Sequence, residues 1–509
     1  GAAAIAMDPN TGAVLGMASS PEYDLNNPNM VADAETAEEL AQLKVTATEE
    51  EYKSALQQAQ WDQWRNKALN DTYEPGSTFK SLVVAAALEE GVVSLSDTFT
   101  CTGSVKVPGW STPIKCHKHE GHGTQTLAQA VENSCNPAFI AIGQRLGTEK
   151  FYDYLERYNL IGTTGIDIPG EGSNNALVWP RENFTTVNLA TASFGQRFQV
   201  TPIQLITGVA SVINGGHLLV PYVVEKISDG NGNALYQHQT SEVRQVISES
   251  TSETVRTILE GVVANGTGHN AYSAGYRIGG KTGTSETLAA DKHNIVSFVG
   301  FAPANDPQVI VLLAYDGPKP VSPGSNYTKD QYYISGGNMA APMAGKLIAN
   351  ILDYMGVEKQ YTPDEMSGAD TMVPKVTGHY LDYAQNLLTQ AGLTYRTVGE
   401  GTVVTGQIPA QGATIPGSSQ VVLYLGNEEV PSDQVEVPNV EGLTPEGVQS
   451  ALNKVGLYLR ATGAVEYYAS SNKAASQSIA AGTLVDRGTV VEVRFVDGSI
   501  QDYAGSVID

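Results

Sequence analysis

Apolar and polar positions in the first part of the chain predict a mixture of strands and helices. The opening residues 1–8 are almost all apolar and predict a strand, which ends at a turn over residues 9–12. Residues 31–70 are rich in Ala, Glu and Gln, which favours helix. Residues 81–90 are apolar on nearly every side of a helix, and this pattern is typical of a buried helix.

The same mixture continues to residue 357 without a regular alternation of strand and helix. Two strands are predicted late, at residues 276–280 ahead of a turn and at residues 309–315. Residues 340–354 predict a closing helix. Strands and helices in this irregular order favour the α+β class.

Two segments after residue 370 resemble each other. Each begins with a Val-Pro pair, at Val373 and at Val437, and continues through a helix-like stretch, an Ala-x-Gly turn and an apolar strand. A repeat of two supersecondary units is the simplest account of this likeness. We therefore divide the chain into a domain at residues 1–360, a linker at 361–371, repeats at 372–427 and 435–498, and a tail at 499–509.

The charge of the chain limits its partners. It carries 30 Lys and Arg against 54 Asp and Glu, a formal net charge of −24 over 509 residues. Such a surface repels phosphate groups, so we expect no nucleic-acid partner. With 41% hydrophobic residues, the chain can bury a sizeable core in more than one domain.

The chain shows neither a membrane segment nor a signal peptide. No apolar run approaches the roughly 20 residues that a membrane helix needs. Because a natural protein rarely begins inside a strand, we expect the sequence to be part of a longer protein. Any N-terminal membrane anchor would then lie outside it.

Ser77 is a candidate nucleophile because Lys80 follows it by three residues. Serine needs a nearby base, and on a helix this spacing places the amine beside the hydroxyl. Burial or a neighbouring cation would favour the neutral amine that accepts the proton. Residues 74–76 predict a turn that puts Ser77 at a helix N-terminus. The spacing alone is weak evidence, since residues 470–473 match it as well.

Two further motifs follow in the chain. Ser134-Cys135-Asn136 is a Ser-x-Asn, although residues 173–175 and 470–472 match too. Lys281-Thr282-Gly283 occurs once and would lie at a sheet edge after the strand predicted at 276–280. Singly, the first could be a helix cap and the second a hairpin turn. The order Ser-x-x-Lys, Ser-x-Asn, Lys-Thr-Gly is that of penicillin-binding proteins and serine β-lactamases.

The flanking residues strengthen this resemblance. The stretches that resemble class B penicillin-binding proteins include Tyr73-Glu74-Pro75-Gly76-Ser77, Ser193-Phe194-Gly195-Gln196 and Ser297-Phe298-Val299-Gly300. The two C-terminal segments resemble PASTA repeats, and the whole chain is similar to vegetative or stage V sporulation proteins of clostridial type. The resemblance implies a transpeptidase fold like that of serine β-lactamases, with a central antiparallel sheet and helices on both faces. Two small α/β PASTA domains would follow it.

The resemblance also implies an acyl transfer that cross-links peptidoglycan. Ser77 would attack the penultimate D-Ala of a D-Ala-D-Ala stem peptide, with Lys80 as general base. Ser134 would relay a proton to the leaving D-Ala, and Asn136 would hold the substrate amide and position Lys80. An amine of a second stem peptide would then accept the acyl group, without a cofactor. β-Lactams would leave a long-lived ester on Ser77.

The remaining implied roles concern the edge that binds substrate. Lys281 would bind the substrate carboxylate, and Thr282, Gly283 and Thr284 would line the strand along which the peptide docks. The backbone N–H groups of Ser77 and Thr284 would form the oxyanion hole.

Other interpretations of the same motifs remain open. A serine β-lactamase would need a further base to activate water, and a D,D-carboxypeptidase would let water accept the acyl group. A sensor would be acylated without turnover, while its PASTA repeats recognise the cell wall. The class B resemblance implies an extracytoplasmic location and a membrane glycosyltransferase partner, because class B proteins lack that activity.

A possible metal site lies between the first two motifs. Cys116 opens a short segment with His117, His119 and His122, and Cys101 precedes it. Cys101, Cys116, His119 and His122 would form a Cys2His2 site for structural zinc, with His117 as an alternative ligand.

Two other outcomes are open for these cysteines. A disulfide between Cys101 and Cys116 would close a loop of ordinary length, or the thiols could be free. We expect Cys135, inside the Ser-x-Asn motif, to line the cleft and not to bind metal.

Overall fold

The computed structural model describes residues 1–287, 293–322, 325–329, 332–360, 370–417, 419–428, 430, 434–463 and 472–497. These residues form two compact units. Among the described residues, the first unit holds Gly1–Ala271 and Ile278–Gly356, and the second holds Tyr272–Arg277 and the chain from Val357 to Asp497. Most of the predicted linker, the predicted tail, and Ser470 and Ser471 of the alternative motif matches lie outside the described residues. The predicted domain boundaries stay a prediction.

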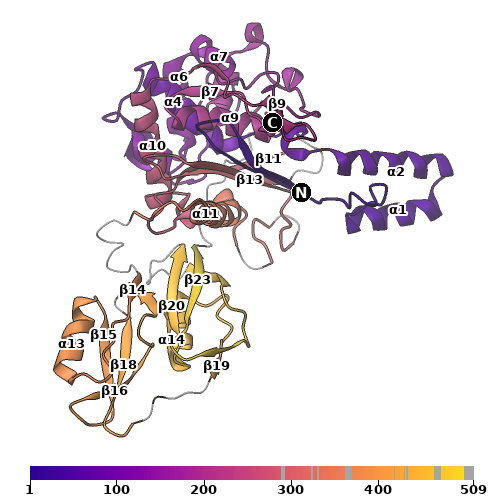
Figure 1. The fold of residues 1–509 in the computed structure, drawn as a ribbon. Coiled ribbons are helices and arrows are strands. Elements are labelled where there is room, and N and C mark those ends of the chain that lie inside the picture. Colours follow the sequence, from indigo (N-terminus) through magenta and orange to yellow (C-terminus); the bar gives the residue numbers. More distant parts are fainter. Residues whose placement is uncertain are drawn as a thin grey trace. The chain divides into compact units, whose positions relative to one another are not determined.

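An antiparallel five-stranded sheet forms the centre of the first unit (Figure 1). Its strands are, in spatial order, β11 (Gly279–Glu286), β12 (Asn294–Ala302), β13 (Val309–Asp316), β1 (Ala2–Met7) and β2 (Val14–Ser20). The predicted strands at residues 1–8 and 309–315 are thus confirmed, and they pair with each other. β11 lies at one edge of the sheet and pairs with one strand of it, β12.

Helices cover both faces of this sheet, as expected for the α+β class. Figure 1 shows α11 (Gly336–Met355) on one face, and α4 (Lys80–Glu89), α9 (Pro202–Ile213) and α10 (Glu249–Asn265) on the other. α9 is buried along its whole length. The first unit also contains α5 (Leu127–Glu132), α6 (Asn136–Leu146), α7 (Thr148–Arg157), α8 (Thr186–Ala192) and the ladders β3 (Thr98–Cys101) with β6 (Gly123–Thr126), β4 (Ser104–Val105) with β5 (Ile114–Lys115), β7 (His217–Leu219) with β10 (Glu242–Gln245), and β8 (Lys226–Ser228) with β9 (Ala234–Gln237).

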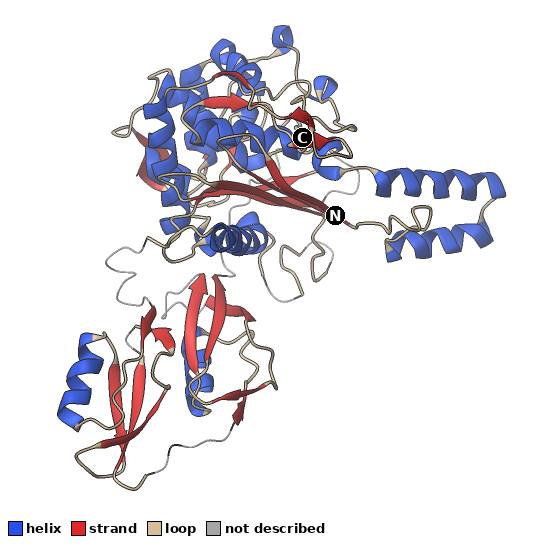
Figure 2. Cartoon of the chain, viewed as in Figure 1, coloured by secondary structure: helices blue, strands red, loops and turns tan. Residues whose placement is uncertain are grey.

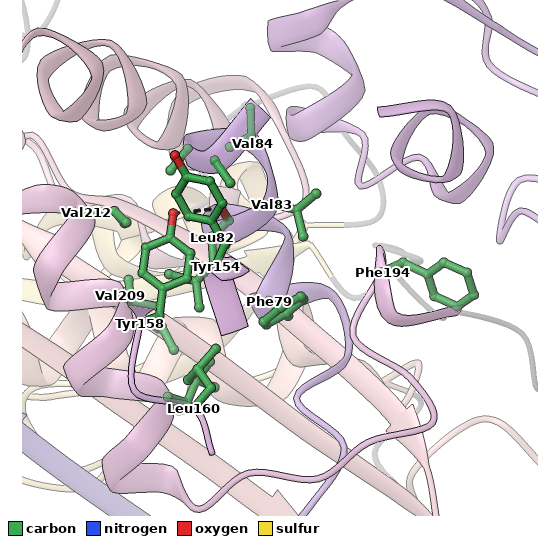
Figure 3. Close-up of a cluster of buried hydrophobic side chains, with 14 of the residues drawn as sticks. Phe79, Leu82, Val83, Val84, Tyr154, Tyr158, Leu160, Phe194, Val209 and Val212 are labelled. Atoms are coloured by element: carbon green, nitrogen blue, oxygen red, sulfur yellow. Dashed lines mark hydrogen bonds between the residues drawn. The ribbon is translucent and has the colours of Figure 1, made fainter. Parts of the chain in front are cut away.

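The predicted buried helix is α4, and it carries Lys80. It is buried from Lys80 to Ala87 because its sequence is apolar all round. Figure 3 shows Phe79 and Leu82 among the core side chains, near Tyr158. The hydroxyl of Tyr158 donates a hydrogen bond of 3.2 Å to the carbonyl of Leu82. This packing fixes the helix and therefore the position of Lys80.

The prediction of a strand at residues 276–280 is wrong in its position. The strand begins at Gly279 and runs to Glu286, so the Lys-Thr-Gly motif lies inside it and does not form a hairpin turn. A Cβ on Gly279 would lie 2.6 Å from the ring of Phe301, and one on Gly280 would lie 2.4 Å from that of Phe298. The strand therefore consists of small and polar residues that lack the usual β pattern.

Residues 31–70 form helices, as predicted. They are α1 (Ala34–Thr46), α2 (Glu49–Trp64) and the short α3 (Lys67–Asn70). α1 and α2 make a hairpin that projects from the rest of the first unit (Figure 2). Thr48 and Glu51 form a capping box at the start of α2. None of the residues of α2 is fully buried.

The second unit contains the same topology twice. Each copy places its last strand between the other two of a three-stranded sheet, with one parallel and one antiparallel pairing. The first copy holds α13 (Leu381–Gln390), β15 (Thr394–Val398), β16 (Val404–Ile408) and β18 (Gln420–Leu425), and the second holds α14 (Pro445–Lys454), β20 (Tyr458–Gly463), β21 (Asn472–Gln477) and β23 (Val490–Asp497). The short ladders β14 (Asp370–Met372) with β17 (Thr414–Pro416) and β19 (Gln434–Glu436) with β22 (Leu484–Asp486) also correspond.

One glutamine, buried at Gln407 and half-buried at Gln477, braces each copy in the same way. Gln407 accepts a hydrogen bond from the N–H of Val376 and donates to the carbonyl of Pro374. Gln477 accepts from the N–H of Val440 and donates to the carbonyl of Pro438. Equivalent contacts at equivalent positions are what an internal repeat predicts. Within the part of the chain that the structure describes, none of the helices has the length and hydrophobicity of a membrane span.

Candidate active site

Ser77 lies on a buried turn at the start of α4. It belongs to a short 3-10 segment, Gly76–Phe79, that leads directly into the helix. Gly76 has a φ of +54°, and a Cβ there would lie 3.1 Å from the carbonyl oxygen of Thr284. Glycine thus lets the turn approach β11 closely. Ser77 is 1% exposed, and its hydroxyl has no hydrogen-bond partner among the described residues.

Lys80 points away from solvent toward the Ser-x-Asn motif. Its Nζ donates to the carbonyl oxygen of Ser134 at 2.8 Å, to Oγ of Ser134 at 3.1 Å and to Oδ1 of Asn136 at 2.7 Å. The lysine is completely buried, so these polar contacts replace water around the amine. Ser134 adopts a φ of +50°, an uncommon conformation for a residue with a side chain.

Lys281 reaches the same hydroxyl from the sheet. Its Nζ lies 3.0 Å from Oγ of Ser134 and 3.2 Å from the carbonyl oxygen of Thr282. Two buried lysines on different elements therefore share one serine hydroxyl. Because burial and a neighbouring like charge both disfavour a protonated amine, this arrangement favours the loss of one proton.

The edge of β11 is shaped by its small residues. Thr282 and Thr284 are buried, and their hydroxyls contact Oγ1 of Thr267 at 3.0 Å and the N–H of Gly336 at 3.0 Å. A Cβ on Gly283 would lie 2.9 Å from Cγ2 of Thr78. Glycine at this position therefore allows the strand to pass against the turn that carries Ser77.

The motifs predicted from sequence thus converge on one place. Lys80, Ser134, Asn136 and Lys281 are brought together by direct contacts, and β11 packs against the Ser77 turn. The alternative Ser-x-Asn match at residues 173–175 is structural, because the Asn174 side chain donates to the carbonyls of Leu160 and Gln199.

A cluster of metal-binding side chains lies next to this site. One ligand atom each of Cys101, Cys116, His122 and Cys135 lies within 4.8 Å of all the others. The three cysteines are buried and none forms a disulfide. The pairing of Cys101 with Gly123 in the β3–β6 ladder brings His122 beside Cys101.

The predicted ligand set needs correction at two positions. His119 is exposed and lies outside the cluster, because residues 118–121 turn back so that the His119 carbonyl packs against Gly103. Cys135, predicted to line the cleft without binding metal, lies in the cluster instead. The alternative ligand His117 lies outside the cluster, with its Nδ1 4.0 Å from Sγ of Cys116 and its ring edge-on to that of His122.

Neighbouring groups favour the thiolate of Cys116. A hydrogen bond from Cys135 and, more weakly, the rings of His117 and His122 lower the pKa of Cys116, while burial opposes them. The contact with Cys116 and burial raise the pKa of Cys135. One thiolate and one thiol in contact are typical of cysteines that share a cation or a proton.

A family model described as the penicillin-binding protein transpeptidase domain matches residues 2–338. The chain belongs to this family. A PASTA domain model matches residues 371–427 and 435–497, so the repeats of this penicillin-binding protein are PASTA domains.

Named relatives agree with the expected resemblance. Stage V sporulation protein D of Bacillus subtilis is 37% identical over 84% of this chain and 61% of its own length. A peptidoglycan D,D-transpeptidase FtsI homolog of Mesostigma viride is 29% identical over 74% of this chain and 58% of its own length. The chain therefore spans about three fifths of these curated relatives.

The fold is also that of the family. The D,D-transpeptidase domain of a peptidoglycan glycosyltransferase from Eggerthella lenta matches with a TM-score of 0.56 and 27% identity. The match covers 70% of this penicillin-binding protein and 78% of that chain. The expected transpeptidase fold with two added PASTA domains is confirmed.

Proposed function

We propose that this penicillin-binding protein is a serine D,D-transpeptidase that cross-links peptidoglycan stem peptides through an acyl-enzyme on Ser77. One observation carries the proposal: Oγ of Ser134 accepts contacts from the amines of both Lys80 and Lys281, at 3.1 and 3.0 Å, in a buried site. This is a proton-relay geometry next to the turn of Ser77, whose hydroxyl has no hydrogen-bond partner among the described residues.

Acylation follows from these positions. Ser77 Oγ attacks the penultimate D-Ala carbonyl and gives its proton to the neutral amine of Lys80. The N–H groups of Ser77 and Thr284 stabilise the oxyanion. As the peptide C–N bond breaks, Ser134 passes a proton to the leaving D-Ala and regains one from a lysine.

Deacylation completes the cross-link. The amine of a second stem peptide attacks the ester carbonyl, loses its proton to the relay, and releases Ser77. Lys281 holds the donor carboxylate in the first step, and Thr282 and Gly283 offer the strand edge for the peptide backbone.

Intact mass after incubation with a β-lactam tests the nucleophile. We expect one covalent adduct per chain, mapped to Ser77 by peptide digestion, because a β-lactam resembles the D-Ala-D-Ala terminus. Ser77→Ala is the control and should show no adduct while remaining folded. An adduct on Ser77→Ala, or none on folded wild type, would contradict the proposal.

The acceptor distinguishes the proposal from its alternatives. A stem-peptide thioester supplied with an acceptor amine should give the cross-linked product, whereas a carboxypeptidase would give only the hydrolysed acid. A β-lactamase would release the adduct within seconds, and a sensor would be acylated by the thioester without making any product.

We also infer that Cys101, Cys116, His122 and Cys135 hold a structural zinc ion. Three thiolates and one imidazole are a usual zinc donor set. Ligand atoms of a tetrahedral site with Zn–S bonds of about 2.3 Å lie about 3.8 Å apart, which is compatible with a cluster inside 4.8 Å. The ion would brace the turn of Ser134, next to Cys135, and takes no part in the acyl transfer. The chemistry itself uses no cofactor.

The proposed reaction implies a location and a partner. Peptidoglycan stem peptides are found outside the cytoplasmic membrane, so we infer an extracytoplasmic location held by a membrane anchor. The proposed acyl transfer joins stem peptides and forms no glycosidic bond. A separate membrane glycosyltransferase would therefore supply the glycan strands.

A cavity between the PASTA repeats favours a second, binding function. It has a volume of about 310 Å³ and is lined by side chains that include Arg396, Arg487, Tyr424 and Tyr458. Guanidinium groups bind carboxylates and tyrosine rings stack on sugars, so the cavity suits a glycan that carries free carboxylates.

Binding to purified cell-wall glycan tests this cavity. We expect Arg396→Gln to weaken binding about tenfold, the loss of one charge-assisted hydrogen bond. Lys375→Gln removes the same charge from an exposed residue that does not line the cavity, and should leave binding unchanged. Equal binding of the two variants would contradict this function.

A further inference from the structure

Glu74 is the only buried carboxylate among the residues that the structure describes. It is 6% exposed and lies three residues before Ser77, in the turn that presents the nucleophile. A buried acid is costly unless it is paired, and such groups concentrate at functional sites. The proposed acyl transfer gives Glu74 no role.

Glu74 connects the nucleophile turn to two other segments. Its Oε1 accepts a hydrogen bond of 3.0 Å from the N–H of Arg197. Its backbone carbonyl accepts one of 2.9 Å from Oγ of Ser285, the residue after Thr284. One residue therefore contacts both the loop at residues 195–197 and the strand that supplies the predicted oxyanion donor.

The loop at residues 195–197 lies directly against the turn. The N–H of Gly76 donates to the carbonyl of Gly195 at 2.9 Å, and a Cβ on Gly195 would lie 1.9 Å from the carbonyl oxygen of Gly76. Arg197 has a φ of +68°, which is unfavourable for a residue with a side chain. The hydrogen bond to Glu74 holds Arg197 in this conformation.

The charge of Glu74 changes within the physiological range. Burial raises the pKa of Glu74 to about 7, although the N–H and the guanidinium of Arg197 act to lower it. In the 195–200 segment, the charged side chain that acts on Glu74 is that of Arg197. The guanidinium of Arg197 lies 5.1 Å from the centre of the Trp110 ring. β11 contributes the neutral hydroxyl of Ser285.

We propose that Glu74 is a positioning residue for the acylation of Ser77: the ionised carboxylate clamps the 195–197 loop onto the nucleophile turn, and protonation loosens the clamp. An ionised acceptor makes a shorter and stronger hydrogen bond to the Arg197 N–H than a neutral one. The turn then holds Ser77 at a fixed distance from β11. The inference rests on the proposed acyl transfer and adds its regulation by pH.

The pH dependence of acylation tests the inference. Glu74→Gln imitates the protonated acid at every pH and can still accept the Arg197 N–H. We expect its second-order rate constant with a β-lactam to equal that of wild type at pH 5.5. At pH 8.5 it should be about tenfold lower, less than the roughly 100-fold that a 1 Å misplacement can cost. The ratio should change with a midpoint near the pKa of about 7.

Thermal stability separates positioning from a general structural effect. Native Glu74 holds its proton more tightly than the unfolded chain does, so its contribution to stability is lost as pH rises through about 7. Glu74→Gln avoids the buried charge and should be at least as stable as wild type at pH 8.5, yet slower. A purely structural role would lower stability and rate together.

Glu89→Gln is the matched control. Burial acts to raise the pKa of Glu89, but hydrogen bonds from Thr251 and Ser248 outweigh it and lower the pKa. Glu89 is therefore ionised over the whole range, and its variant should keep the wild-type shape of the pH profile.

Each outcome decides between the proposals. A ratio of Glu74→Gln to wild type that does not vary with pH overturns the role of Glu74 and leaves the transpeptidase intact. A wild type that no β-lactam acylates at any pH overturns both. If Glu74→Gln does not fold, Glu74→Asp decides: the inference expects a shifted midpoint, and an unshifted midpoint contradicts it.

Discussion

Replacing Lys80 by methionine is expected to slow acylation of Ser77 by about 10³-fold at neutral pH, within the 10²–10⁴ range for a lost general base. Methionine keeps the length and apolar stem of the side chain in a site that is completely buried. It removes the only group in this turn of α4 that can accept the serine proton, and with it the contacts to Ser134 and Asn136. The rate should be measured by stopped-flow acylation with a β-lactam.

Two lysine variants serve as comparisons for Lys80→Met. Lys281→Met should mainly weaken binding of carboxylate-bearing β-lactams, because Lys281 reaches Ser134 from the edge strand and faces the predicted carboxylate position. Lys150→Met breaks a surface ion pair with Glu90 and should leave acylation unchanged. A folded Lys80→Met variant within tenfold of the wild-type rate would contradict Lys80 as general base.

The functional motifs could be predicted because each depends on a short local spacing. Ser77 lies in the 3-10 segment that leads into α4, and Lys80 follows it by three residues as the first residue of that helix. Their order before Ser134 and Lys281 favours one family. Convergence of the three elements at the hydroxyl of Ser134 could not be predicted in the same way. It depends on tertiary packing, which residue spacing does not encode.

β11 shows why part of the fold was missed. Buried strands are usually predicted from β-branched and aromatic residues, yet the sequence of β11 is Gly-Gly-Lys-Thr-Gly-Thr-Ser-Glu. The rings of Phe298 and Phe301 occupy the space over its glycines. Close packing at these glycines and at Gly283, beside Thr78, requires small residues here, so tertiary packing overrides the strand propensity.

The metal ligands show the limit of local spacing. Cys116 and His119 have a familiar ligand spacing, but the backbone turns His119 outward. Cys135 follows Cys116 by 19 residues, and its place inside the Ser-x-Asn motif predicts a residue of the cleft and not a ligand. The alternation Thr-Phe-Thr-Cys in β3, with Phe99 and Cys101 buried, was the available signal that Cys101 points inward.

Replacing Cys135 by serine is expected to abolish stoichiometric zinc binding. Apparent binding free energies of structural zinc are about 10–16 kcal/mol at neutral pH, so loss of one thiolate ligand should lower affinity by orders of magnitude. Zinc content should be measured by elemental analysis and by native mass of protein purified under reducing conditions. We expect one zinc per wild-type chain and none in Cys135→Ser.

His119→Ala is the control that separates the two ligand sets. His119 is exposed and outside the cluster, so this variant should keep one zinc per chain, with unchanged melting temperature and acylation rate. Zinc lost from His119→Ala but kept by Cys135→Ser would favour the set predicted from sequence. Folded wild type that takes up no zinc with all thiols reduced would contradict the site altogether.

The position of Cys135 would couple the proposed zinc ion to the reaction site. Ser134 and Asn136 flank it, and both contact Lys80. Loss of the ion should therefore free the turn with φ of +50° at Ser134 and slow acylation, in addition to lowering the melting temperature. Chelation of zinc from wild type should reproduce both effects, and re-addition of zinc should reverse them. If removal of the ion lowers the melting temperature but leaves the acylation rate unchanged, the ion stabilises the fold and does not brace the Ser-x-Asn motif.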